Sequence, residues 1–121
     1  MANTSRQLKL FDGHELLYFV DTRLAGGDPH AIFGVLDEHL RFLSNLAAEG
    51  KLAFAGPLDT ATGANSGNGI YALRVASLRD AQAIVAQDPL HKKGIRIGHV
   101  SPWHRKKDWS VLPDPQDFPP E

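Results

Sequence analysis

The sequence contains no cysteine, which excludes disulfide bonds, thiol nucleophiles and thiolate metal sites together. It also lacks a surplus of charge of either sign, because 13 Lys and Arg stand against 14 Asp and Glu. A chain without a basic surplus has little with which to hold a polyanion, so we expect no nucleic-acid partner. Any chemistry at this protein must use oxygen and nitrogen groups.

Long hydrophobic runs are missing as well. The apolar run LLYFV at residues 16–20 is far shorter than the roughly 20 residues that span a bilayer. The first 13 residues have no apolar segment typical of a signal peptide. We therefore expect a cytoplasmic protein that does not bind membranes. Its 121 residues, 42% of them hydrophobic, suit one modest core and hence one folded domain.

The first half of the chain predicts a strand followed by a helix. Residues 15–27 are rich in aliphatic and aromatic residues and end at a double glycine, which is typical of a strand. The following segment opens with Asp28 as a plausible N-cap and Pro29 in the first turn, and it closes at Gly50. Its apolar residues recur at helical spacing and predict one buried face, made of Ile32, Phe33, Leu36, Leu40, Leu43, Leu46 and Ala47.

The second half predicts three more strands and one helix. Strands are expected at 51–58 and 70–76, joined by a polar, glycine-containing turn, and a helix at 77–87 begins with Ser77 and Asp80 in capping-box spacing. Asp88-Pro89 ends that helix, and a loop leads to a last strand at 95–101. In that strand Ile95, Ile97 and His99 alternate with Arg96, Gly98 and Val100.

Both ends of the chain are expected to lie outside the domain. Residues 1–14 form a polar tail, residues 15–101 form the domain, and residues 102–121 hold five of the eight prolines. This proline-rich extension shows no sustained period, so we expect it to be irregular and to pack through Trp103, Trp109 and Phe118.

The order βαββαβ predicts an α+β fold of the ferredoxin-like type, a four-stranded antiparallel sheet with two helices on one face. The other face of the sheet keeps apolar residues whichever parity points outward, such as Leu17 and Phe19, or Tyr71, Leu73 and Val75. Leaving several hundred Å² of apolar surface in water would forgo about 10 kcal/mol. We therefore expect a homodimer that packs sheet to sheet.

Three segments resemble a known family, the YciI-like (YCII-related) proteins. They are EHLRFLSNLAAEGKLAFAGPL at 38–58, GIYALRVASLRDAQAIVAQDPLHKKGI at 69–95 and HVSPW at 99–103. The resemblance implies a dimeric α+β barrel with a His-Asp active site, which would fall on His39 and Asp88. Members similar to this chain include a dehydrochlorinase that acts on a chlorinated hydroxyhydroquinone. Many relatives carry an arginine three residues before the histidine, where this chain has Leu36.

His39 interrupts the apolar face of the first predicted helix, and two interpretations remain open. It is either a core histidine satisfied by a hydrogen bond or a group kept for proton transfer. Asp88 likewise suits a turn before proline, or a partner for His39, because both helices lie on the same sheet face. A carboxylate that accepts the Nδ1 proton leaves Nε2 free as a general base, worth roughly 10²- to 10⁴-fold in rate.

That chemistry suits elimination, isomerisation or tautomerisation of a small aromatic or keto substrate, and it needs no cofactor. The pair and the resemblance together imply a cofactor-free lyase or isomerase, which could be of the dehydrochlorinase type, with His39 and Asp88 as its catalytic residues. The alternative is a non-enzymatic dimer that binds a metabolite or has a regulatory role. The residues alone leave open which of the two it is.

Three further side chains are candidates for substrate binding, namely Ser44, Arg74 and Tyr18. Each has a simpler interpretation, since a helical serine is usually solvated, a strand arginine usually faces water and a tyrosine usually packs in a core. The histidines His91, His99 and His104 are spaced by eight and five residues, which matches no common metal-binding signature. We expect no metal site.

Overall fold

A computed structural model describes residues 14–107, 109 and 110 of the chain. It divides into a compact unit of residues 17–102 and a second unit that joins the residues before Leu17 to those after Pro102. In the second unit Arg105 Nη1 lies 3.6 Å from Glu15 Oε1, and Lys106 Nζ lies 5.6 Å from the ring centroid of Trp109. Across the described residues, no helix has the length and apolar character that a membrane span needs.

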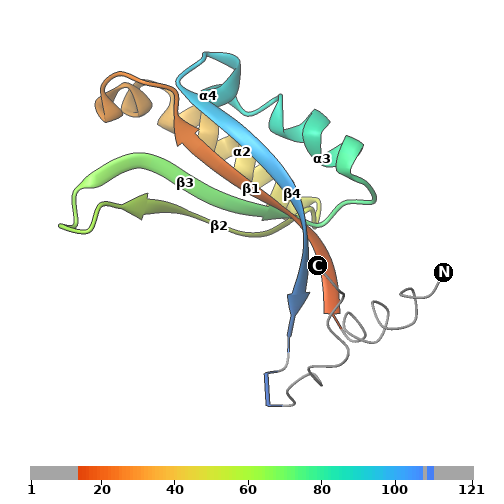
Figure 1. The fold of residues 1–121 in the computed structure, drawn as a ribbon. Coiled ribbons are helices and arrows are strands. Elements are labelled where there is room, and N and C mark those ends of the chain that lie inside the picture. The colour runs from red at the N-terminus through yellow and green to blue at the C-terminus, as the bar shows by residue number, and fades with distance from the viewer. Residues whose placement is uncertain (1–13, 108, 111–121) are drawn as a thin grey trace. The chain divides into compact units, whose positions relative to one another are not determined.

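Four strands form one sheet in the order β2-β3-β1-β4. They are β1 (His14–Leu24), β2 (Leu52–Asp59), β3 (Asn65–Leu73) and β4 (Arg96–Lys106). Strands β1 and β2 both pair antiparallel with β3, with Tyr18 and Leu52 each opposite Leu73. The helices α2 (Leu36–Ala48) and α3 (Leu78–Val85) lie on one face of this sheet (Figure 1). The predicted ferredoxin-like arrangement of strands and helices is confirmed.

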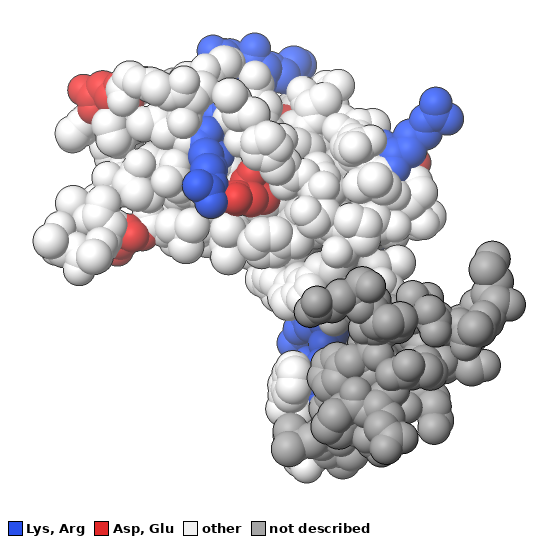
Figure 2. Space-filling view, in the orientation of Figure 1, with Lys and Arg blue, Asp and Glu red and all other residues white. Residues whose placement is uncertain are grey.

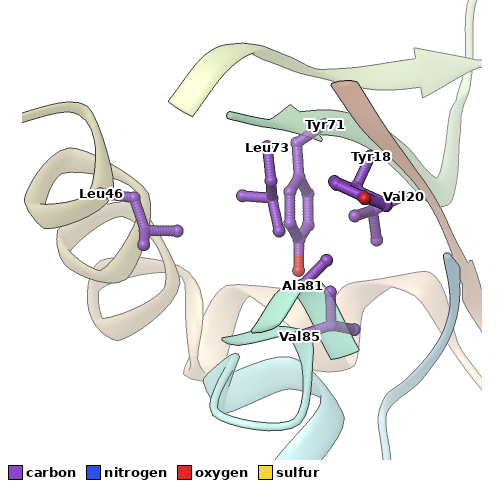
Figure 3. Packing of buried hydrophobic residues seen from close by; sticks show 7 residues of the cluster. All are labelled: Tyr18, Val20, Leu46, Tyr71, Leu73, Ala81 and Val85. Carbon is purple, nitrogen blue, oxygen red and sulfur yellow. The ribbon is translucent and has the colours of Figure 1, made fainter. Parts of the chain in front are cut away.

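The main core lies between the sheet and these two helices. Figure 3 shows the ring of Tyr71 reaching from β3 towards Ala81 and Val85 of α3. Helix α3 begins where the sequence predicts, because the Ser77 side chain accepts a hydrogen bond from the Asp80 N–H at 3.1 Å. The buried cluster consists of Tyr18, Val20, Leu46, Tyr71, Leu73, Ala81 and Val85.

The expected single helix from Asp28 to Gly50 is two helices in the structure. A 3₁₀ helix, η1 (Pro29–Gly34), is followed by Val35, and α2 begins directly after that residue. Val35 has φ −123° and donates its N–H to Ile32, in the i→i+3 pattern of a 3₁₀ turn. A glycine followed by a β-branched residue favours such a break, because both are poor helix formers.

This break changes which side chains face the core. Phe33 and Leu40, expected on the buried face, are 59% and 53% exposed. His39 is buried in their stead, with an exposed fraction of only 7%. The interrupted helix therefore directs an imidazole inward where a continuous apolar stripe would have placed leucine.

Three later boundaries also differ from the expected ones. Strand β3 begins at Asn65, inside the segment expected to be a turn, because Asn65 and Asn68 continue the pairing with β2. The segment expected to be a loop, residues 90–94, instead begins within the short helix α4 (Pro89–Lys92). Strand β4 continues to Lys106, so the extension is not irregular from residue 102 onward. Phe118 and residues 1–13 lie outside the described residues.

Gly98 permits a close approach between β4 and the helices. A Cβ at this position would lie 2.7 Å from Cε1 of His91 and 2.9 Å from Cγ1 of Val85, well inside van der Waals contact. Any side chain there would push α4 away from the sheet. The glycine thus fixes the position of His91, the only histidine of α4.

Pro57 lies within β2, which is an edge strand of the described sheet. A proline has no backbone N–H and is tolerated in a sheet only at such an edge. In the register of the two strands, Pro57 lies opposite Gly69 of β3. The proline therefore fits the strand order that the structure shows.

Candidate active site

The structure brings His39 and Asp88 together. Nδ1 of His39 lies 2.9 Å from Oδ1 of Asp88, across 49 residues of sequence. His39 lies in the first turn of α2, where its N–H bonds to the carbonyl of Val35, and Asp88 lies between α3 and α4. Both side chains are buried, and Asp88 is fully so.

Asp88 accepts more hydrogen bonds than the one from His39. Its Oδ2 accepts from the Tyr71 hydroxyl at 3.1 Å, and its Oδ1 accepts from the Leu90 N–H at 3.0 Å. The Leu90 contact makes Asp88 the N-cap of α4. The preceding helix, expected to reach residue 87, ends at Val85, and a carboxylate suits the N-cap position that Asp88 occupies.

The surroundings of Asp88 keep its carboxylate ionised. Burial is the largest single influence, and it raises the pKa of Asp88. The hydrogen bond and charge of His39 oppose it, and so do the Leu90 N–H and the charge of His91. The net result is a pKa of Asp88 below its usual value. An ionised carboxylate only accepts hydrogen bonds, so Nδ1 of His39 is the donor. A neutral His39 then has its lone pair on Nε2.

A cavity of about 320 Å³ opens beside this pair. Its apolar wall comes from η1 and α2, and its polar wall includes His39, Tyr71, Thr22 and Arg96. Within the described part of the chain, Nε2 of His39 makes no hydrogen bond. A pocket of this volume with a few convergent polar groups suits a compact organic molecule. The apolar wall is formed by Ile32, Leu36, Leu40 and Leu43.

Tyr71 should tie the site to protein stability at high pH. Burial, then the charge and hydrogen bond of Asp88, raise the pKa of Tyr71 far above its usual value, so the hydroxyl stays protonated in the folded protein. Its stabilising contribution is complete below about pH 10 and is lost as pH rises further, since the unfolded tyrosine ionises there. We expect Tyr71→Phe to cost about 1.5–3 kcal/mol of unfolding free energy at pH 8.

Urea denaturation at pH 8 and at about pH 10.5 measures this effect. The difference between wild type and Tyr71→Phe should shrink at the higher pH, because only the wild type loses the contribution. Tyr18→Phe is the matched control, since Tyr18 is also buried in the core, and in the described part of the chain it makes no hydrogen bond to Asp88. An equal difference at both pH values would contradict this assignment.

The three predicted substrate-binding residues lie away from this cavity. Ser44 is exposed on α2, Arg74 is exposed after β3 beside Lys51 and Asp80, and Tyr18 is buried in the main core. None of them lines the cavity beside His39. Ser44 follows His39 by five residues on α2, which places the two side chains on different faces of the helix. Arg74 comes directly after the last residue of β3 and so lies outside the strand.

Sequence reasoning overlooked Thr22 and Arg96 as residues of the site. A signal was present for Arg96, because it shares its strand face with Gly98 and Val100, the face that turns towards the helices. Thr22 offers no such signal, since a threonine in a strand is common. Its hydroxyl lies 2.7 Å from Nε2 of His91, whose Nδ1 donates to the carbonyl of Val85 at 2.8 Å.

The sequence contains no metal-binding signature for His91, His99 and His104. His91 and His99 line a second, more open cavity of about 530 Å³, which also includes Arg96. Among the residues that the structure describes, no group of three or more histidine and carboxylate side chains is arranged to hold a metal ion.

The chain belongs to the YCII-related domain family, whose model matches residues 18–104. This range includes both members of the His39–Asp88 pair. Among solved structures it is similar to 5-chloro-2-hydroxyhydroquinone dehydrochlorinase from Burkholderia phenoliruptrix AC1100, in a complex with 2,5-dihydroxybenzoquinone. The TM-score is 0.61 at 20% sequence identity, over 72% of this chain and 92% of that one. A search of curated proteins found no match.

Proposed function

We propose that this protein is a cofactor-free lyase or isomerase that acts on a small aromatic or keto compound. The observation that supports this most is the hydrogen bond of 2.9 Å between His39 and Asp88 at the edge of the cavity. Nε2 of His39 serves as the general base, and Asp88 holds the ring in the required tautomer. Tyr71 and the N–H of Leu90 hold Asp88 in turn.

The proposed chemistry begins with transfer of one proton from the substrate to Nε2. In an isomerisation, the protonated imidazole returns that proton to a different atom of the same molecule. In an elimination, the electron pair left behind forms a new π bond, and a leaving group such as a halide departs with its own bonding electrons. One base suffices for either route, and the buried Asp88 stabilises the imidazolium while it lasts.

The structural similarity to the dehydrochlorinase supports a small aromatic or keto compound as the substrate. Its complex contains 2,5-dihydroxybenzoquinone, a compact ring with oxygen substituents. The cavity of about 320 Å³ here has room for a molecule of that size, and its leucine and isoleucine wall suits the faces of a ring. Halogenated hydroxyaromatics and their keto tautomers are therefore the compounds to try first.

A panel of chlorinated and hydroxylated aromatics tests the proposal. Each compound is incubated with the purified protein, and conversion is followed by ultraviolet absorbance and by release of halide. Saturable conversion of a panel member is the expected result. Tight binding of a panel member without any conversion would instead favour the ligand-binding dimer, which uses the same cavity without chemistry.

We also propose that two copies associate through the face of the sheet opposite the helices. Phe54, Leu58 and Ile97 point to that face and are 38%, 41% and 53% exposed. Ile97 lies there because its neighbours Arg96 and Gly98 face the helices, and Phe54 because it pairs with Ala72 rather than Tyr71. In Figure 2 charged side chains occupy only small parts of the visible surface over the sheet. Exposed apolar surface of this kind favours association.

Sedimentation velocity at micromolar concentration tests the association. We expect wild type to sediment as a species of twice the 13.2 kDa chain mass. The double variant Phe54→Lys, Ile97→Lys should be a monomer, because the lysines of the two copies would repel one another across an otherwise apolar interface. Leu78→Lys is the control, because Leu78 is 37% exposed on α3 instead. A wild-type monomer would contradict the proposal.

A further inference from the structure

Arg96 is a buried cation without an ion-pair partner in the described part of the chain. It begins β4, and its exposed fraction is 7%. The only hydrogen bond that its side chain forms with described residues runs from Nε to the carbonyl oxygen of Gly67, at 2.8 Å. Burial of an arginine without a carboxylate is costly, and natural proteins rarely keep one without a use.

The two terminal nitrogens of Arg96 are therefore available for other contacts. A Cβ at Gly69 would lie 3.2 Å from Nη1 and 3.5 Å from Nη2, so the absence of a side chain at Gly69 makes room for the guanidinium. Arg96 lines the same cavity as His39 and Tyr71. The N–H groups at Nη1 and Nη2 are thus hydrogen-bond donors without a described protein acceptor, beside a pocket.

The charges around Arg96 do not replace a bound anion. Burial is the main influence and lowers the pKa of Arg96, while the attraction of Asp88 and the interaction with Tyr71 oppose that change. Asp88 already accepts from His39, Tyr71 and the Leu90 N–H, and no hydrogen bond joins it to Arg96. The positive charge of the guanidinium therefore lies beside the pocket, and no acceptor among the described residues contacts its terminal nitrogens.

We propose that Arg96 binds an oxygen anion of the ligand, so that the pocket selects a compact ring that carries a phenolate or a carboxylate. This inference rests on the proposed function, because it specifies the substrate class of the same site. A guanidinium presents parallel N–H donors that suit two oxygen atoms or one concentrated negative charge. In this arrangement Arg96 stabilises the anionic oxygen while His39 Nε2 exchanges a proton with the rest of the ring system.

The competing interpretation is a purely structural arginine that ties β4 to the start of β3 through Gly67. That role predicts lower stability in any variant that lacks Nε, but no preference of the pocket for anions. The two interpretations therefore differ in a binding measurement that needs no turnover.

The probe for this measurement is 4-nitrophenol, whose phenol and phenolate absorb at different wavelengths. Wild type should bind the phenolate more tightly than the phenol, so that the apparent pKa of the bound probe falls by about one unit or more, a tenfold preference. Arg96→Met should abolish the shift, and it should weaken binding of benzoate at least about tenfold while leaving the neutral benzyl alcohol unaffected. Comparison of benzoate with nitrophenol shows whether carboxylate or phenolate is preferred.

Two variants complete the test. Arg96→Lys keeps a positive charge and should retain part of the shift, and it serves if Arg96→Met does not fold. Arg23→Met removes an arginine that is 68% exposed and paired with Asp21, so binding should not change. Equal wild-type affinity for phenol and phenolate, or an undiminished shift in Arg96→Met, would overturn the inference. A failure of the conversion panel would not, because the probe reports binding alone.

Discussion

Replacement of Asp88 by alanine should lower the free energy of unfolding by about 3–5 kcal/mol at pH 7. The carboxylate accepts from the His39 ring, the Tyr71 hydroxyl and the Leu90 N–H, and Asp88 is fully buried. Its removal leaves three donors without an acceptor and removes the N-cap of α4. Urea denaturation followed by circular dichroism measures the loss.

Two comparisons give this prediction a sharper form. Asp80→Ala removes an exposed carboxylate in the first turn of α3 and should cost less than about 1 kcal/mol. Because the pKa of Asp88 is lowered by folding, its contribution is present above about pH 4 and is lost as the pH falls through the lower folded value. The difference between wild type and Asp88→Asn should therefore diminish as the pH falls below about 4. A cost for Asp88→Ala no larger than that of Asp80→Ala would refute this account.

Replacement of His39 by asparagine should reduce turnover of any converted panel compound by about 10²- to 10⁴-fold. The asparagine amide can still donate to Asp88 from a position near that of Nδ1, but it has no counterpart of Nε2. Stability should fall by less than about 2 kcal/mol, because the buried carboxylate keeps a donor. Steady-state kinetics and urea denaturation of the same preparation separate the two effects.

Asp88→Asn provides a second measurement of the same mechanism. Its amide can present an N–H instead of an acceptor to Nδ1, which would place the imidazole proton on Nε2 and remove the base. The corresponding substitution in serine proteases lowers turnover about 10⁴-fold. His30→Asn is the control, since Nδ1 of His30 lies at the same distance of 2.9 Å from a carboxylate, that of Asp28, in an exposed pair away from the cavity. Full turnover in His39→Asn would end the general-base proposal.

Much of the fold follows from local patterns in the sequence. Ser77 with Asp80, Asp88-Pro89 and Gly50 each mark a boundary through backbone chemistry that needs no tertiary context, and Gly50 adopts φ +74° as a helix terminator requires. The order of strands and helices then fixes the fold. The pairing of His39 with Asp88 is what the resemblance to the family implies, and the placement of both helices on one face of the sheet is compatible with it.

The parts that could not be predicted depend on tertiary contacts. The break at Val35 sets the rotation of α2, and the low helix propensity of Gly34 and Val35 permits such a break without specifying a 3₁₀ turn. Helix α4 is stable because Asp88 caps it and Leu90 is fully buried, both consequences of the assembled site. The inward direction of Arg96 follows from strand parity, but its value for binding appears only beside a cavity.

The proline in β2 has a consequence for how copies of this chain meet. If a strand of a second molecule paired with the β2 edge of the sheet, it would find no backbone N–H at Pro57. The hydrogen bonding between the two strands would therefore be interrupted at that residue. Growth into a continuous, open-ended ribbon is thereby discouraged on this side. The proposed face-to-face association of two sheets does not use this edge, so Pro57 does not hinder it.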